Sequence, residues 1–70
     1  MMPLTAGNIG ESYSVKKVGG LEETKRFLTN LGFTEGAEIS IISRMAGNVI
    51  VNVRDARVAI NEDMARKIMV

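Results

Sequence analysis

Apolar residues recur at every second position in three short stretches of the chain, and this pattern predicts half-buried strands over residues 38–44, 49–53 and 57–60. Residues 13–18 also resemble a strand. Val18 breaks their alternation, so we expect a bend or bulge between Val15 and Val18. Residues 68–70 are expected to form a last short strand that pairs near the beginning of the chain.

One segment, residues 21–31, has the helical period instead. The residues that share its apolar face are Leu21, Thr24, Leu28 and Leu31. Phe27 lies beside this face, and we expect it in the core. Gly32 follows at the point where a left-handed cap is needed. Residues 61–67 predict a short helical turn with Asn61 as its cap.

The first tight hairpin must bring Ile39 and Ile41 onto the face that carries the alternating valines of residues 49–53. A three-residue loop over residues 46–48 satisfies this requirement, because its glycine and asparagine tolerate positive φ. In this register Ile42 and Ile50 are diagonal neighbours on the outer surface.

The second hairpin takes a two-residue turn at residues 55–56, which would place Arg54 opposite Arg57. A four-residue turn over residues 54–57 is the alternative, because Ala56 suits a tight turn poorly. Short strands around one aliphatic core, with one good helix and no repeat or linker, predict a mainly β fold. We expect a small, strongly bent barrel of about five strands in a single domain, residues 1–70.

The amino-acid composition limits the kinds of catalytic and metal-binding site that the chain can form. The chain has no cysteine and no histidine, which excludes disulfides, thiolate ligands and the commonest general base. We therefore expect no enzyme activity, no catalytic residue, no metal ligand and no cofactor. The acidic pairs at residues 22–23 and 62–63 stand at helix starts, where they stabilise the helix dipole.

Neither a membrane helix nor a secretory signal is expected, because no apolar run reaches about 18 residues and no basic region precedes one. This pattern is typical of a cytoplasmic protein without membrane insertion. The net charge of +1 gives no overall attraction to nucleic acid. Arg44, Arg54 and Arg57 could nevertheless line up across the middle strands, which keeps a nucleic-acid-binding face as an alternative.

An outer apolar cluster is the feature that indicates a partner. Ile42 and Ile50 lie opposite the core face, with Met45 at the hairpin tip. A cluster of exposed apolar residues is typical of a contact surface. The alternatives are that the helix covers this cluster or that a homodimer does.

The order of motifs along the chain resembles ferrous iron transport protein A, the FeoA family. The motifs are Pro3-Leu4, Gly10-Glu11, Leu31-Gly32-Phe33-Thr34-Glu35-Gly36, Val58-Ala59-Ile60 and Ile68-Met69-Val70. The resemblance covers nearly the whole chain, and residues 31–36 with the helix before them are its most specific part.

The resemblance implies an SH3-like barrel with one inserted helix and a short helical turn before the last strand. It also implies a cytosolic accessory protein of a bacterial ferrous iron uptake system, which binds and modulates the cytosolic domain of the membrane iron transporter. The residues expected to make this contact are Ile42, Arg44, Met45, Ile50, Arg54, Phe33 and Thr34. The alternatives are a nucleic-acid-binding SH3-like barrel and a stand-alone metal-sensing regulatory domain.

Overall fold

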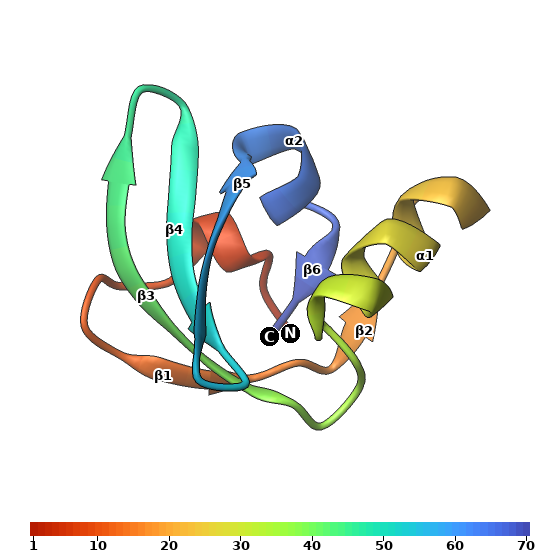
Figure 1. The fold of residues 1–70 in the computed structure, drawn as a ribbon, viewed down its shortest axis with the longest axis horizontal. Coiled ribbons are helices and arrows are strands. Elements are labelled where there is room, and N and C mark those ends of the chain that lie inside the picture. Colours follow the sequence, from red (N-terminus) through yellow and green to blue (C-terminus); the bar gives the residue numbers. More distant parts are fainter.

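The computed structural model describes residues 1–70, which form two antiparallel sheets around one core (Figure 1). The larger sheet has the order β1-β3-β4-β5, with β1 Ser12–Ser14, β3 Glu38–Met45, β4 Asn48–Val53 and β5 Ala56–Asn61. The smaller sheet pairs β2 Lys17–Val18 with β6 Ile68–Met69. The helices are the 3-10 turn η1 Leu4–Ala6, α1 Glu22–Leu31 and the short α2 Glu62–Ala65. The predicted mainly β fold is confirmed.

The expected first strand is divided between the two sheets, which gives six strands where about five were predicted. Val15 and Lys16 lie at the division. The Val15 N–H donates to the Ala37 carbonyl at 2.9 Å, and the Lys16 N–H donates to the Met69 carbonyl at 2.8 Å. Successive residues thus bond to different sheets, and this is the predicted bend.

The two ends of the chain lie side by side, as predicted (Figure 1). The amide and carbonyl of Met2 exchange hydrogen bonds with those of Val70 at 3.0 and 2.8 Å. The pairing of Met2 with Val70 ties the end of the chain to its first residues and closes the barrel.

The predicted cap of α2 is also confirmed. The Asn61 side chain accepts the Met64 N–H at 2.8 Å.

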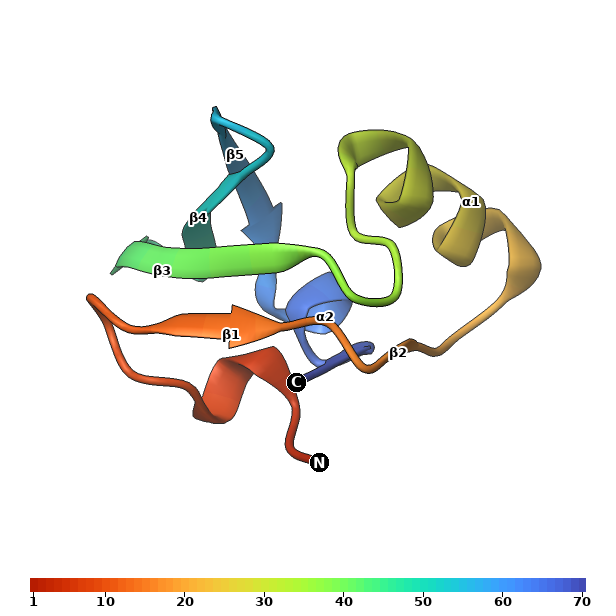
Figure 2. The same ribbon diagram turned by 90° about the horizontal axis from the view of Figure 1, so that it is seen from below.

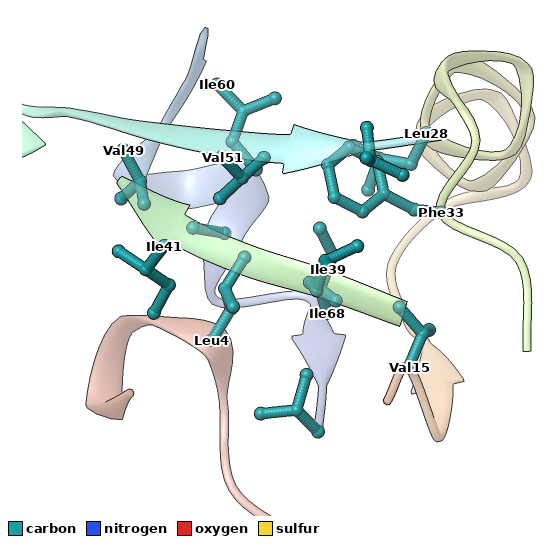
Figure 3. Close-up of a cluster of buried hydrophobic side chains, with 13 residues drawn as sticks. Leu4, Val15, Leu28, Phe33, Ile39, Ile41, Val49, Val51, Ile60 and Ile68 are labelled. Atoms are coloured by element: carbon teal, nitrogen blue, oxygen red, sulfur yellow. The ribbon is translucent and has the colours of Figure 1, made fainter. Parts of the chain in front are cut away.

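The core consists of 13 buried hydrophobic residues and no buried polar side chain. Figure 3 shows how they converge from several elements: Leu4 from η1, Leu28 from α1, Ile60 from β5, Ile68 from β6, and the alternate isoleucines and valines of β3 and β4. The period-2 pattern of these strands therefore marks the inner face of the sheet.

Helix α1 is attached to the barrel mainly through its last turn. Gly32 adopts a left-handed conformation (φ 113°), and the Phe33 N–H reaches back to the Leu28 carbonyl at 3.0 Å. Leu28 and Phe33 are both fully buried, which completes the cap that glycine makes possible. Leu28 is the one buried residue of the helix, and the rest of α1 projects to the side of the barrel (Figure 2).

The prediction that Phe27 lies in the core is wrong, because 48% of its surface is exposed. Leu21, on the predicted apolar face, is 77% exposed. Phe27 lies in α1 next to the buried Leu28, and Leu21 immediately precedes the helix. A helical pattern defines which residues share a side of the helix, but tertiary packing decides how many of them are covered.

The first tight hairpin places the predicted residues on the core face, but its turn and its register differ from the prediction. Its turn contains two residues, Ala46 and Gly47, not the predicted three. The register then shifts between Ile41 and Ser43, where Ile42 is an extra residue without a partner. This β-bulge offsets the shorter turn by one residue, so that Ile39 and Ile41 still share the core face with the valines.

The second hairpin turns at Arg54 and Asp55, one residue earlier than predicted. Both residues have left-handed backbones, with φ of 50° and 62°. Arg57 consequently lies opposite Asn52, and the prediction that Arg54 and Arg57 face each other is wrong. A tight turn of this hand matches the twist of the strands even without a glycine.

Candidate protein-interaction surface

The bulge in β3 creates the outer apolar surface. Two residues of a bulged strand oppose one residue of its partner, and here Ile42 and Ser43 lie opposite Ile50. Ile42 and Ile50 are therefore neighbours on the outer face, although not through the predicted register. Both are partly exposed, and Met45 at the hairpin tip is 66% exposed. We call Ile42, Met45 and Ile50 the hairpin surface.

Ile9 extends this region and was not predicted. Its side chain is 55% exposed, and the next residue, Gly10, donates its N–H to the Ile41 carbonyl at 2.7 Å. These contacts place Ile9 beside the bulged part of β3. The only signal in the sequence was one apolar residue within a glycine-containing turn, which by itself is typical of a loop.

Arg44 has a structural partner within the chain. The bulge places Arg44 opposite Val49, whose side chain is in the core, and so directs it away from the outer face. Its Nη2 donates to the carbonyls of Thr5 and Gly7 at 3.0 and 2.6 Å. The guanidinium thus fastens η1 and the residue after it to the barrel. The outer surface expected to include Arg44 is therefore formed without it.

The remaining site residues gather at the other end of the sheet. Arg54 Nη2 lies 3.4 Å from Thr34 Oγ1 and donates to it. Gly32 packs beneath the same arginine, since a Cβ on Gly32 would lie 3.2 Å from Arg54 Cδ. Phe33 is fully buried and presents no side chain to a partner. The predicted residues therefore form two separate groups, and only the hairpin surface is apolar and open.

The outer face between these groups is polar and shallow. Ser12, Ser40, Asn52 and Arg57 follow one another across the four strands. Beside them lies an open hollow of about 310 Å³, lined by Glu38, Arg54 and Asp55 together with three of these residues. No polar side-chain atom is buried there without a partner. The hollow therefore lacks the enclosed, mostly apolar walls of a typical small-molecule site.

The charged residues do not form a cluster suited to hold a metal ion or an extended ion-pair network. No three residues of the types histidine, cysteine, aspartate and glutamate come together in the structure. The single ion pair joins Arg66 to Asp63 on α2. Arg44, Arg54 and Arg57 do not form the stripe that a nucleic-acid face would need, because the first clasps η1 and the second occupies a turn. No helix is long and apolar enough to cross a membrane.

Curved antiparallel strands joined by tight hairpins around one core, with a helix inserted between β2 and β3, define a small SH3-like barrel. The model of the FeoA domain matches residues 2–70, and the chain belongs to the FeoA family, which is associated with ferrous iron transport. No curated protein sequence matches the chain.

Solved structures agree with this assignment. The crystal structure of an iron uptake regulatory protein (FeoA) superposes with a TM-score of 0.90 at 30% identity, covering 99% of this chain and 92% of that one. FeoA of Stenotrophomonas maltophilia complexed with zinc, described as a prokaryotic SH3 domain protein, gives 0.89 at 25% identity and covers 100% and 89%.

A manganese-dependent transcriptional repressor shares the fold alone. It gives a TM-score of 0.86 at 20% identity, and the match covers 94% of this chain but 38% of the repressor. The same fold therefore also occurs as part of a longer protein.

Proposed function

We propose that the protein is a non-catalytic accessory module that binds the cytosolic domain of a ferrous iron transporter and modulates that transporter through protein–protein contacts. Its place of action is the cytoplasm. The FeoA family membership supports the link to ferrous iron transport. The S. maltophilia relative is described as a candidate activating factor of bacterial ferrous iron transport, which supports modulation of a transporter.

The hairpin surface is the observation that carries this proposal. Ile42 and Ile50 are adjacent on the outer face, and Met45 stands exposed at the tip of the same hairpin. Their burial by a partner would remove apolar area from water, and methionine adapts readily to the shape of a partner. Ala59, opposite Ile50 on β5, is small and exposed, so a partner can approach the isoleucine closely.

The side chains available support the non-catalytic part of this proposal. No histidine or cysteine is present, and no serine therefore has an imidazole to activate it. Arg54 is the one exposed cation of the predicted contact set that remains at the outer face, which favours a partner with carboxylates at its rim.

The test measures the affinity for the soluble cytosolic domain of the ferrous iron transporter by isothermal titration calorimetry. Ile42→Glu and Met45→Glu each place a charge on the hairpin surface, and we expect each to weaken binding about tenfold or more. Leu21→Glu is the matched control, because it places the same charge on a comparably exposed apolar residue of α1. Equal affinity of all three variants and the unaltered protein would remove the hairpin surface from the interface.

A further inference from the structure

Strand β5 is an open edge of the larger sheet. It spans six residues, Ala56–Asn61, and pairs with β4 on one side only. No strand lies along its other side. An edge of this kind offers a row of backbone donors and acceptors to another chain.

The turn geometry determines which groups face outward. Val53 and Ala56 flank a two-residue turn, so they form a hydrogen-bonded pair, and alternate pairs along the ladder do the same. Ala56, Val58 and Ile60 therefore bond to β4. Arg57 and Ala59 direct their N–H and C=O groups away from the sheet, and no other hydrogen bond of the chain reaches these groups.

The other edges of the fold offer less. β1 has three residues and β2 has two, so neither presents more than a short run of backbone groups. Of the usual protections of an edge strand, β5 has one exposed charged side chain, Arg57, but no proline, no bulge and no charged residue on its inner face. Its small residues, Ala56 and Ala59, leave room for a neighbouring backbone about 4.8 Å away.

Charge indicates what kind of strand fits. Arg57 is exposed on β5 and makes no ion pair or side-chain hydrogen bond, and Arg54 stands at the turn before it. We propose that the β5 edge binds an extended peptide segment of a partner protein, carrying carboxylates opposite Arg57, as a fifth strand of the larger sheet. Backbone pairing supplies the affinity and the carboxylate supplies the selectivity.

A second copy of this chain fits this edge less well. Pairing two β5 strands around a twofold axis places no carboxylate opposite Arg57, because residues 56–61 contain no acidic residue. One six-residue strand also provides far less than the roughly 1,200 Å² that a stable interface buries. The proposal is independent of the hairpin surface and stands whether or not that surface binds a transporter.

The probe is a blocked peptide of alternating glutamate and valine, as long as β5, and a lysine–valine peptide is its control. Binding is followed by chemical shifts and hydrogen exchange of the ¹⁵N-labelled protein at low salt. We expect the amides of Arg57 and Ala59 to shift most and to exchange more slowly when the acidic peptide is added. The lysine peptide should bind about fivefold more weakly.

Two variants separate backbone pairing from charge. Ala59→Pro removes an outward N–H while leaving the ladder to β4 intact, and it should weaken binding about fivefold. Arg57→Glu keeps the backbone and should reverse the preference between the two peptides, so the proposal stays testable if the proline variant fails to fold.

Three results would overturn the proposal. The first is a lack of saturable shifts at Arg57 and Ala59 with the acidic peptide. The second is equal affinity for both peptides. The third is slow exchange of these two amides in the free protein together with a dimer in sedimentation equilibrium, which would make a second copy the occupant.

Discussion

The clasp between Arg44 and η1 predicts a large effect from one exposed side chain. Arg44→Ala removes two charge-assisted hydrogen bonds, to the carbonyls of Thr5 and Gly7. Such bonds contribute about 1.5–3 kcal/mol each when well shielded. The Thr5 bond is exposed and the Gly7 bond is partly buried, so we expect a combined loss of about 2–3 kcal/mol.

For a domain of this size, that loss corresponds to a fall in Tm of about 10–20 °C. It is also a large share of the total, because domains are stable by only about 0.05–0.15 kcal/mol per residue. The measurement is thermal and urea unfolding followed by circular dichroism. Arg57→Ala is the matched control, since Arg57 is an exposed arginine without a hydrogen bond or ion pair, and its loss should change stability by less than about 0.5 kcal/mol.

Arg44→Lys separates the contribution of the positive charge from that of the guanidinium geometry. It keeps the charge but replaces the planar fork with a single ammonium, so about half of the loss is expected. If Arg44→Ala and Arg57→Ala unfold at the same temperature, the clasp carries no stability and Arg44 is free for another role.

Three further substitutions test local features by the same unfolding measurement. Gly32→Ala should cost about 1–2 kcal/mol, because φ is 113° and the new Cβ would lie 3.2 Å from Val53 Cγ2; unchanged stability would contradict the cap described for α1. Asp55→Gly should raise stability by about 0.5 kcal/mol, since glycine relieves a left-handed residue in the turn, and a loss would show that the aspartate is held there by more than backbone geometry. Asn61→Ala should cost about 1 kcal/mol through the lost cap of α2, with no change expected if the bond to the Met64 N–H is absent in solution.

Much of the fold could be predicted from local patterns. The inner faces of β3, β4 and β5 follow from alternation, and the end of α1 follows from Leu28 and Gly32. These predictions succeed because burial of one face and the need for a left-handed residue act within a few residues of the chain.

The register of the first tight hairpin could not be predicted. For Ile39 and Ile41 to share a face with the valines of β4, the hairpin needs one residue more than a two-residue turn with regular pairing provides. Either a longer loop or a bulge can supply that residue. The chain places that residue at Ile42, and Ala46 accepts positive φ so that the turn can be short. Both routes give the same alternation of inward and outward residues, so the local pattern does not distinguish them.

The incorrect register of this hairpin also affected the residues predicted for the candidate site. The neighbours Ile42 and Ile50 were predicted correctly, because both lie on the outer face in either register. Arg44 was assigned to the same surface, but the bulge turns it towards Thr5 and Gly7. A shift of one residue moves a side chain to the opposite face of a strand, so an error in register changes a residue's role completely.

The central claim is that the hairpin surface binds the transporter's cytosolic domain, and one titration tests it most directly. The ¹⁵N-labelled protein is titrated with that soluble domain, and amide signals are compared along the chain. The account predicts that signals of Ile42, Met45 and Ile50 change or broaden first, while those of α1 stay in place. Perturbation confined to α1 or to β2 and β6, or none at saturating concentration, would contradict it.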